Sequence, residues 1–346
     1  MRKVHVTFYH RCPQGANFSI ERLFADIRGA LPVNIESRVA VSRFPSRGFL
    51  PRIYNILEAI FRQGDINHIT GDVHFLTYLL FRKRTVLTIH DLVSVHRLKG
   101  WRKSILLFFW YSLPVRRASV VTVISESTKQ DLLKHIQIDA EKIKVIYNCV
   151  SLHFKPIPKV FNAAKPIVLQ IGTGQNKNLE RVVMALQGIS CHLRIIGKLK
   201  KTQIALLEEN SIEYSHASEI PDEQIVDEYR ACDLLIFAST YEGFGLPIIE
   251  AQATGRPVIT SNILSMAEVA QTTACVIDPF DVESIREGIK KVIDEAPYRE
   301  ELIRLGYINA TRFESGQIAE EYSKLYMSLI ADASTSSPGS FSNKNS

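Results

Sequence analysis

The stretch Glu242-Gly-Phe-Gly-Leu-Pro-Ile-Ile-Glu250 joins an apolar segment with the composition of a buried strand, residues 234–237, to a helical segment that ends near Gly255. Its glycines allow the backbone to approach a ligand closely. Pro247 stands in the first helical turn, where its missing N–H costs nothing. The amides of residues 244–246 lie at the positive end of the helix dipole, which suits a phosphate. The stretch therefore predicts an α/β fold in which a helix begins at an anionic ligand.

Carboxylates stand at both ends of this loop, at Glu242 and Glu250. A carboxylate accepts hydrogen bonds from hydroxyl groups, which a sugar or a ribose supplies in pairs. Glu242 is expected to precede the helix, because Gly243, Gly245 and Pro247 disfavour a helix that would include it. We therefore expect the two carboxylates to bind opposite ends of one ligand rather than to act as an acid/base pair. Phosphate and polyol together indicate a sugar nucleotide. The loop alone is equally typical of a plain strand-to-helix turn with an exposed Glu250, so the rest of the chain has to decide.

The chain has 346 residues, enough for two domains, and its charge is divided unevenly. Residues 1–160 hold 25 Lys and Arg against 11 Asp and Glu, net +14, whereas residues 161–346 hold 17 against 25, net −8. The basic first half predicts contact with an anionic surface, such as a membrane leaflet. No nucleic-acid-binding motif accompanies the charge, so we expect no nucleic acid partner. The five scattered cysteines show no zinc-type spacing and favour reduced core thiols in the cytoplasm.

Short apolar strands alternate with amphipathic helices along the first half of the chain. Apolar strands without internal alternation, spaced by helices, indicate a parallel sheet covered on both faces, as in a doubly wound domain. The expected strands are residues 4–9, 34–41, 66–70, 85–89, 120–124 and 143–147, and the expected helices are 18–31, 50–61, 73–80, 101–117 and 126–135.

A proline-containing break follows, and the same alternation restarts at residue 167. We take residues 156–166 as a linker between a first domain, 1–155, and a second Rossmann-like domain, 167–332, whose last helix could cross back to the first. The tail, 333–346, is rich in Ser, Asn and Gly and is expected to be disordered. The second domain is expected to contain strands 167–171, 193–196, 234–237 and 257–261, with helices 178–186, 202–210, 222–232, 282–293, 297–310 and 313–330.

A second glycine loop, Gly172-Thr-Gly174-Gln-Asn-Lys177-Asn178, follows the strand expected at 167–171. A dinucleotide fingerprint would have a third glycine where Lys177 stands, and an acid where the next strand ends in Ile196-Gly197-Lys198, so NAD is disfavoured. A lysine at a glycine loop that opens a helix suits a pyrophosphate. Taken by itself, Lys177 is more typical of a solvated lysine. Its place at the carboxyl end of a strand, where open sheets bind ligands, favours a function.

Together these motifs resemble the retaining glycosyltransferases of family 4, the group 1 glycosyltransferases. Their GT-B fold has two facing Rossmann-like domains with the active site in the cleft between them. The most specific element is E-x7-E, matched by Glu242 and Glu250. The resemblance covers most of the chain and is strongest in residues 167–282. Further matches are Gly172 to Asn178, Ala253-Thr-Gly255-Arg-Pro257, Glu268-Val269, Asp278-Pro279 and, in the first half, Thr88-Ile89-His90-Asp91, Ser125-Glu126-Ser127-Thr128 and Ile146-Tyr147-Asn148.

The resemblance implies a role for several residues. Glu250 would hold the ribose hydroxyls, and Glu242 would hold the transferred sugar together with the amides of Phe244 and Gly245. His90, at the carboxyl end of a first-domain strand, would reach the sugar near the reacting carbon; without the resemblance it is equally typical of a structural turn. The diphosphate would be held by the Leu246 amide, by Lys177 and by the loop residues Gly172 and Thr173.

The chain departs from the family pattern at two places. The family often has an arginine directly after the glycine that Gly172 matches, whereas this chain has Thr173, so diphosphate binding is expected to depend more on Lys177. The glycine loop on the acceptor side is reduced to residues 14–17, in which Gly15 and Asn17 are the candidate acceptor-side residues. No Asp-x-Asp stands in a suitable loop. We therefore expect no metal, and no cofactor beyond a GDP- or UDP-sugar substrate.

The implied reaction is a metal-independent, retaining transfer of a hexosyl group from a nucleotide-diphosphate sugar to a glycan or lipid-linked acceptor, in surface polysaccharide or lipopolysaccharide biosynthesis. His90, Glu242 and Lys177 are the candidate catalytic residues. No protein nucleophile is assigned, because a leaving phosphate oxygen can accept the acceptor's proton. One alternative is a UDP-sugar epimerase of the same fold, which would need acid/base groups around the sugar. Another is a non-catalytic nucleotide-sugar-binding subunit of a polysaccharide assembly complex. The departure from the family pattern at Thr173 is compatible with this alternative.

The basic residues 97–103 precede an apolar, aromatic run at 105–111. This pattern is equally typical of a core-facing helix with a solvated start and of a peripheral membrane contact in which Lys and Arg meet anionic lipid. The run is far shorter than the roughly 20 residues that a membrane span needs, and the apolar start at 4–9 is too short for a signal peptide. We expect a cytoplasmic protein with a peripheral contact at the inner face of the plasma membrane.

Overall fold

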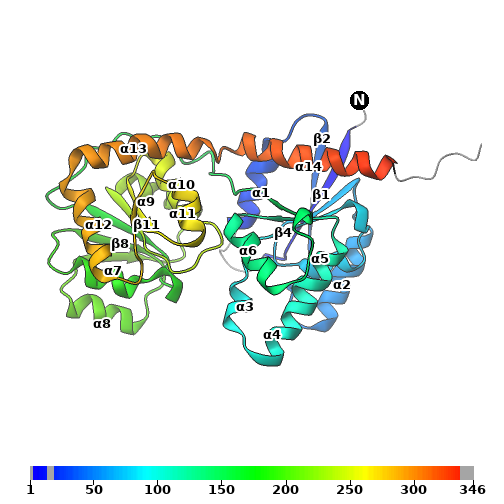
Figure 1. The fold of residues 1–346 in the computed structure, drawn as a ribbon, viewed down its shortest axis with the longest axis horizontal. Helices are drawn as coiled ribbons and strands as arrows, with labels where there is room; N and C mark the ends of the chain where they lie inside the picture. Colours follow the sequence, from blue (N-terminus) through cyan, green and yellow to red (C-terminus); the bar gives the residue numbers. More distant parts are fainter. Residues whose placement is uncertain (1–2, 14–18, 336–346) are drawn as a thin grey trace, which may run out of the picture. The chain divides into compact units, whose positions relative to one another are not determined.

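The computed structural model describes residues 3–13 and 19–335, and the chain divides into two compact units (Figure 1). The first comprises residues 1–123, 131–146 and 319–346, and the second comprises 124–130 and 147–318. Helix α6 (Glu126–His135) and helix α14 (Ser315–Thr335) each have residues in both units. The C-terminal helix is therefore shared, and most of it belongs with the N-terminal sheet.

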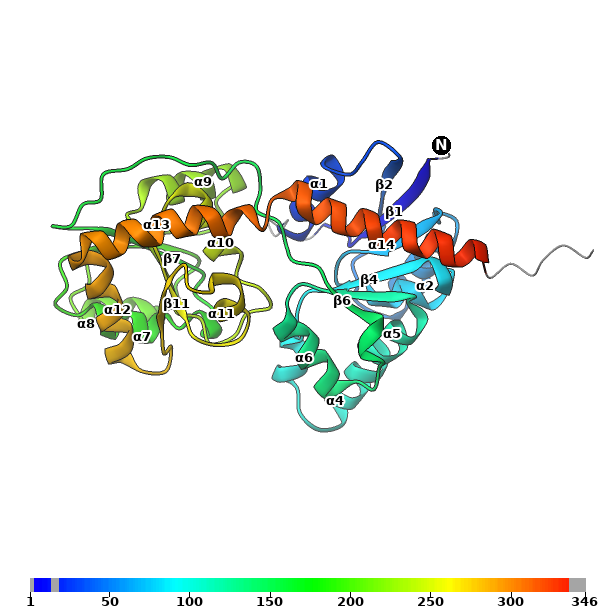
Figure 2. The same ribbon diagram turned by 45° about the horizontal axis from the view of Figure 1, so that its top comes forward.

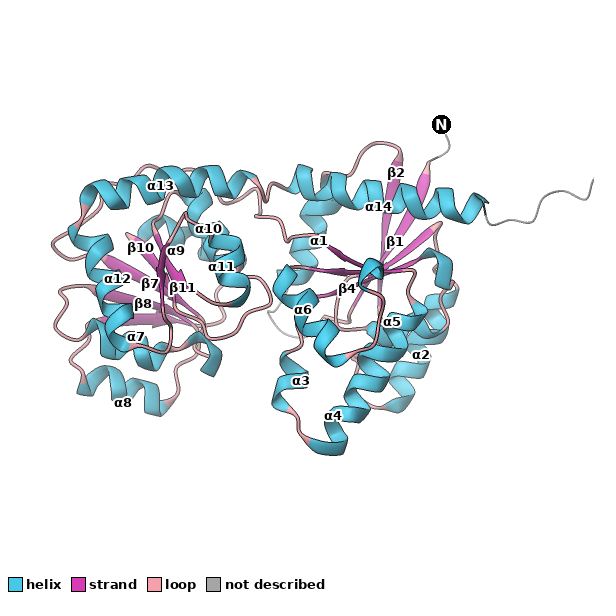
Figure 3. Ribbon diagram, in the orientation of Figure 1, coloured by secondary structure: helices cyan, strands magenta, loops and turns pink. Residues whose placement is uncertain are grey.

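The first unit contains a six-stranded sheet in the order β2-β1-β3-β4-β5-β6. All its neighbouring strands pair in parallel, and helices cover its faces (Figure 3). The six strands expected in this half of the chain are all present. They are β1 (Val4–His10), β2 (Ile35–Val41), β3 (Ile66–Ile69), β4 (Thr85–Ile89), β5 (Val120–Val123) and β6 (Ile143–Val145), with helices α1 (Ser19–Gly29), α2 (Phe49–Ile60), α3 (Val93–Arg97), α4 (Gly100–Leu106) and α5 (Leu113–Arg117).

Helix α14 lies along this sheet (Figure 2), and its residues Tyr322 and Tyr326 contact Phe8 and His68 of the sheet. The Tyr326 ring meets Phe8 edge-on, with ring centroids 6.3 Å apart, and its hydroxyl lies 2.6 Å from His68 Nδ1. The other nitrogen of His68 lies 2.7 Å from the Thr88 hydroxyl. Burial holds the pKa of His68 well below its usual value. A neutral histidine with both nitrogens partnered thus fixes the last helix to strands β3 and β4.

The second unit repeats the plan with the strand order β12-β11-β10-β7-β8-β9, again entirely parallel. Two parallel α/β sheets were predicted, and this prediction is confirmed. The strands are β7 (Ile167–Ile171), β8 (His192–Ile196), β9 (Tyr214–Ala217), β10 (Leu234–Phe237), β11 (Val258–Ser261) and β12 (Cys275–Ile277), with helices α7 (Leu179–Leu186), α8 (Lys201–Glu209), α9 (Asp222–Ala231), α10 (Leu246–Thr254), α11 (Leu264–Ala270), α12 (Val282–Asp294) and α13 (Ala296–Thr311).

The expected helix at 101–117 is interrupted by a π-helical segment, Leu107–Ser112. Pro114 follows this segment and has no N–H to offer the carbonyl of Trp110, four residues before it. His74 Nδ1–H donates to that carbonyl instead, at 2.9 Å. The wider turn and the histidine together accommodate a proline inside a helix.

Other differences from the sequence predictions concern short elements. The helix expected at 73–80 is a 3₁₀ segment, His74–Tyr78. Strands β9 and β12 and helices α3 and α11 were not predicted; β9 and β12 lie at the edges of the sheet, where a long apolar run is not needed. Helix α14 continues through Thr335, so residues 333–335 of the tail expected to be disordered are helical, and the rest of that tail lies outside the described residues.

All five cysteines are free thiols. Four are buried, as predicted, and Cys12 is only half-buried. Over residues 3–13 and 19–335, none of the helices combines the length and apolarity that crossing a bilayer requires.

Candidate functional site

Strands β7 and β10 are neighbours at the centre of the second sheet. Strands β8 and β9 lie beyond β7, whereas β11 and β12 lie beyond β10, so the chain order reverses between them. In open parallel sheets, ligands bind outside the carboxyl ends of the strands at such a point. The segments that follow β7 and β10 are residues 172–178 and 238–245. The topology therefore brings the two glycine loops of the sequence to one edge of one sheet.

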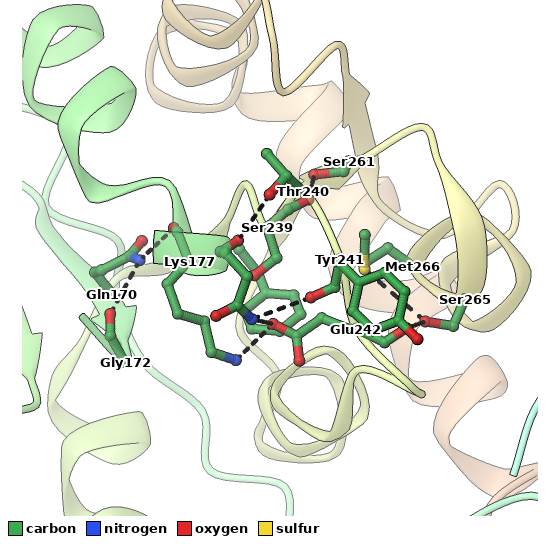
Figure 4. A network of polar contacts seen from close by, with 12 residues as sticks. Gln170, Gly172, Lys177, Ser239, Thr240, Tyr241, Glu242, Ser261, Ser265 and Met266 are labelled. Carbon is green, nitrogen blue, oxygen red and sulfur yellow. Dashed lines mark hydrogen bonds and ion pairs between the residues drawn. The ribbon is translucent and has the colours of Figure 1, made fainter. Parts of the chain in front are cut away.

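Lys177 and Glu242 contact each other across these loops (Figure 4). Lys177 Nζ donates to Glu242 Oε1 at 2.6 Å, and only 20% and 16% of the two side chains are exposed. Asn176 Nδ2 donates to the same oxygen at 3.2 Å and to the Tyr241 carbonyl at 3.0 Å. The Lys177 ammonium also lies 4.7 Å from the centre of the Phe237 ring. The cation and the carboxylate that the sequence singled out are thus held in one half-buried network.

Gly172 gives Lys177 the space it occupies. Its φ is +90°, and a Cβ at this position would lie 2.8 Å from Lys177 Cε. Gln170 Nε2 donates to the Lys177 carbonyl at 3.0 Å, which fixes the backbone of the loop. Thr173, where the family often has arginine, donates its hydroxyl to the Lys198 carbonyl at 2.7 Å. Its side chain therefore ties this loop to the segment after β8.

Helix α10 begins directly after Gly245, whose φ of +113° is accessible to glycine and strained for other residues. Pro247 stands in its first turn, as predicted. The Phe244 side chain is buried and packs on Tyr147 and Phe313, with ring centroids 6.0 and 5.6 Å away. The group that Phe244 can offer to a ligand is therefore its backbone. Pro247 has no N–H, and the Ile248 amide donates to the Gly245 carbonyl at 3.0 Å. The Leu246 amide is therefore the first donor of α10 and lies at the positive end of the helix.

Glu250 lies on α10 and is 7% exposed, so the alternative of an exposed helix residue is wrong. The Tyr229 hydroxyl donates to Glu250 Oε2 at 2.7 Å. A buried carboxylate without such partners would be costly. Tyr229 on α9 is a residue that the sequence did not single out, because a tyrosine on an amphipathic helix has the ordinary appearance of a core residue.

Two carbonyls of the Glu242 loop are fixed by side chains of the second unit. The hydroxyls of Ser125 and Thr128 donate to the Gly243 carbonyl at 2.7 and 3.1 Å. The Ser265 hydroxyl donates to the Glu242 carbonyl at 2.8 Å. The Glu268 carboxylate accepts hydrogen bonds from the backbone amides of Glu126 and Ser127, at 2.8 and 3.2 Å. These two bonds fix the first turn of α6. The sequence matched Ser125, Thr128 and Glu268 to the family without a role, and here they position the loop.

His90 follows β4 in the first unit. Its Nε2–H donates to the Thr70 carbonyl at 2.8 Å. A carbonyl only accepts, so the neutral ring carries its proton on Nε2 and its lone pair on Nδ1. Burial lowers the pKa of His90 and favours this neutral form. The acceptor-side candidates Gly15 and Asn17 lie outside the described residues.

Comparison with protein families assigns both halves of the chain. A model described as Glycosyltransferase Family 4 matches residues 1–154, and one described as Glycosyl transferases group 1 matches residues 154–308. The second match includes both loops, Lys177, Glu242 and Glu250. The chain belongs to the family 4, group 1 glycosyltransferases.

Bacterial mannosyltransferases are among the relatives of this glycosyltransferase. It is 38% identical over 94 residues to the O-antigen chain mannosyltransferase B of Escherichia coli, covering 27% of this chain and 25% of that protein. It is 26% identical over 228 residues to the O-antigen chain mannosyltransferase RfbU of Salmonella typhimurium, covering 62% of each. These matches thus span a quarter and somewhat under two thirds of the two relatives.

Among solved structures, this glycosyltransferase resembles HepE of Anabaena in complex with UDP and glucose. The TM-score is 0.74 at 16% identity, over 94% of this chain and all of that one. At this identity the likeness concerns the fold, and it agrees with the GT-B assignment of the two sheets.

Among the described residues of this glycosyltransferase, one group of three potential metal ligands gathers. It consists of His96, Asp131 and His135, on α3 and α6 of the first unit, whose ligand atoms lie within 4.8 Å of one another. His96 Nε2 lies 2.7 Å from an Asp131 oxygen. The group belongs to the first unit, whereas the two glycine loops belong to the second.

Proposed function

We propose that this glycosyltransferase moves a hexosyl group from a nucleotide-diphosphate sugar to a glycan or lipid-linked acceptor, with retention of the anomeric configuration, in the synthesis of a surface polysaccharide or lipopolysaccharide. The observation that carries the proposal is the Lys177–Glu242 contact at the reversal of the strand order, with Glu250 buried on the helix that follows. The mannosyltransferase names of the two relatives favour mannose as the first sugar to test. The UDP bound to HepE supports a nucleotide donor.

Stabilising the leaving group is the main task in this reaction, because breaking the bond to the anomeric carbon leaves a doubly charged nucleoside diphosphate. Lys177 would meet this charge as a point cation, and the Leu246 amide would add the field of the α10 dipole. To do so, the Lys177 ammonium would break its contact with the Glu242 carboxylate and bind the diphosphate instead. Glu242 is then available to the hydroxyls of the sugar.

The nucleoside end of the donor would be held by Glu250. Its carboxylate accepts hydrogen bonds from ribose hydroxyls, and Tyr229 orients it. Glu242 and Glu250 lie on different elements, the loop and α10, so they can hold different parts of one ligand.

The anomeric configuration is retained if the acceptor oxygen attacks the anomeric carbon from the same face that the phosphate leaves. The bond between the anomeric carbon and the phosphate oxygen breaks, the bond to the acceptor oxygen forms, and the acceptor's proton passes to the departing phosphate. Neither a protein nucleophile nor a metal is needed, because Lys177 and the helix amides carry the charge compensation.

The test is a thermal-shift panel of GDP- and UDP-sugars, GDP-mannose included, followed by transfer of radiolabelled sugar to glycan and lipid-linked acceptors with and without EDTA. We expect stabilisation by one nucleotide class and EDTA-resistant transfer that is lost in Lys177→Ala and Glu250→Gln. Unchanged turnover in either variant would overturn the site. Stabilisation without transfer would favour the non-catalytic subunit, and interconversion of the donor sugar would favour the epimerase.

A further inference from the structure

Helix α2 of the first unit presents an apolar face to solvent. Asn55 and Ala59 are buried on its inner side. The opposite side carries large apolar side chains at helical spacing, which places them on one face. Phe49 is 76% exposed, Leu50 75% and Phe61, directly after the helix, 88%. The exposed set is Phe49, Leu50, Ile53, Tyr54, Leu57 and Phe61. Contiguous apolar surface of this kind marks a binding site.

A second apolar face lies on the neighbouring helix of residues 100–117. Trp101 is 70% exposed, and Ile105, Phe108 and Phe109 are each about half exposed, again at helical spacing. The Arg52 guanidinium of α2 lies 5.0 Å from the centre of the Trp110 ring, which joins the two helices side by side (Figures 1 and 2). We call these two faces together the α2–α4 surface.

Positive charge surrounds the α2–α4 surface. The exposed Arg43 and Arg47 precede α2, and Arg97, Lys99 and Arg102 are exposed at the start of α4. Acidic residues are almost missing from the sequence here: residues 92–125 contain none, and residues 37–64 contain only Glu58. Glu58 is neutralised by Arg62, whose Nη2 lies 2.6 Å from its carboxylate. The surface therefore combines aromatic and aliphatic side chains with segments in which basic residues far outnumber acidic ones.

We propose that the α2–α4 surface binds an anionic lipid bilayer, with its apolar side chains in the interface and its arginines and lysines at the lipid phosphates. Amphipathic helices with a basic rim lie in the bilayer plane in this way, and Trp and Tyr favour the headgroup level. A second copy of the chain fits less well, since a two-fold contact would bring the same basic residues together across the axis. The sequence pointed to residues 97–111, and the structure adds α2 as the larger apolar face.

This binding stands independently of the transfer reaction. The test is co-flotation of the full chain with phosphatidylcholine vesicles and with vesicles that contain about one third phosphatidylglycerol. We expect binding to the second kind, weakened by salt because screening reduces the attraction of the basic residues. The double substitution Phe49→Ser and Leu57→Ser, and separately Arg47→Glu with Arg102→Glu, should each weaken binding by about tenfold or more.

Matched controls use exposed positions that are not part of the surface. Val33→Ser removes an apolar side chain that is 94% exposed, and Lys201→Glu reverses an exposed charge on α8. Both should bind vesicles like the parent chain, and all variants should keep the parent's thermal unfolding midpoint. Flotation that does not depend on anionic lipid, or that survives both double substitutions, would overturn the proposal. So would a dimer in sedimentation velocity that the Phe49/Leu57 substitutions dissociate, because the face would then belong to a second copy.

Discussion

Lys177 Nζ lies 2.6 Å from Glu242 Oε1, so the residue that would hold the diphosphate and the residue that would hold the sugar contact each other. The pair is mostly shielded from solvent, and an ion pair in such a place is stronger than one at the surface. In the proposed site, a donor would have to separate them before each could take up its own part of the ligand. In that site the pair would therefore oppose binding of the nucleoside diphosphate alone, which offers Lys177 a partner and leaves Glu242 with the Asn176 amide but without a cation.

The substitution Glu242→Gln separates these effects. It removes the charge that competes for Lys177, so GDP or UDP alone should bind about three- to tenfold more tightly. Sugar transfer should fall, because the amide cannot accept from a hydroxyl as strongly as the carboxylate does. Isothermal titration calorimetry measures the affinity for the nucleoside diphosphate, and a steady-state assay measures the rate of sugar transfer. Lys177→Ala serves as the opposite case, with both nucleotide binding and transfer reduced. Weaker nucleotide binding in Glu242→Gln would contradict competition within the pair.

Gly172→Ala tests the space that Lys177 occupies. The new Cβ would meet Lys177 Cε at 2.8 Å, so the lysine has to move. The positive φ adds backbone strain of about 1–2 kcal/mol. Gly188→Ala is the matched control, since its φ is also positive and a Cβ there meets nothing within 4 Å. Both variants should lose similar stability in urea unfolding, but Gly172→Ala alone should lose nucleotide affinity. Equal affinity in the two would show that Lys177 does not depend on Gly172.

Much of this arrangement could be predicted from local sequence. The glycines at 172 and 245 stand where the backbone needs positive φ, and Pro247 marks the start of α10, so strand, loop and helix were each visible in the chain. The central strand β10 is buried throughout and carries a continuous apolar run, and its neighbour β7 is apolar except for Gln170. The half-exposed edge strand β9, Tyr214–Ala217, carries no such run and was missed.

Contacts between distant parts of the sequence were less predictable. The partnership of Glu250 with Tyr229 joins α10 to α9, and no local pattern in either helix indicates that these two positions meet. The hydroxyls of Ser125 and Thr128 reach the Gly243 carbonyl from more than a hundred residues away. Such contacts depend on how whole elements pack, which a local pattern does not encode. The sequence could therefore name the residues that would touch a donor, but not those that hold them.

Tyr229→Phe tests one of these supporting contacts. It removes the hydroxyl that donates to Glu250 Oε2 and leaves that buried oxygen without this partner. We expect a loss of about 1–3 kcal/mol of stability. The KM for the nucleotide sugar should rise more than kcat falls, because Glu250 would act in binding. Tyr214→Phe is the control, as its half-exposed ring stacks on His216 at a centroid distance of 6.4 Å. An unchanged donor KM in Tyr229→Phe would remove Tyr229 from the site.

His10 at the end of β1 is a buried histidine that resists protonation. It is 4% exposed, and its Nε2 lies 3.1 Å from Arg28 Nη1. Since arginine only donates, Nε2 accepts, and the ring is neutral with its proton on Nδ1. Burial, followed by the charge of Arg28, lowers the pKa of His10 to about 4; the charge of Glu21 opposes this shift and that of Arg11 adds to it. Burial also lowers the pKa values of the buried histidines His68, His74 and His90 in the same unit.

A histidine whose pKa falls on folding stabilises the protein above its unfolded pKa near 6.5, and this contribution is lost as the pH falls toward the folded value. For His10 the window runs from pH 6.5 to about 4, and the loss amounts to about 3 kcal/mol. Urea unfolding at several pH values should therefore show stability falling steeply in this window. His10→Gln should flatten the fall by about that amount, whereas His153→Gln, at an exposed position of the second unit, should leave it unchanged. An equal slope in parent and His10→Gln would show that His10 is protonated in the folded chain or contributes nothing.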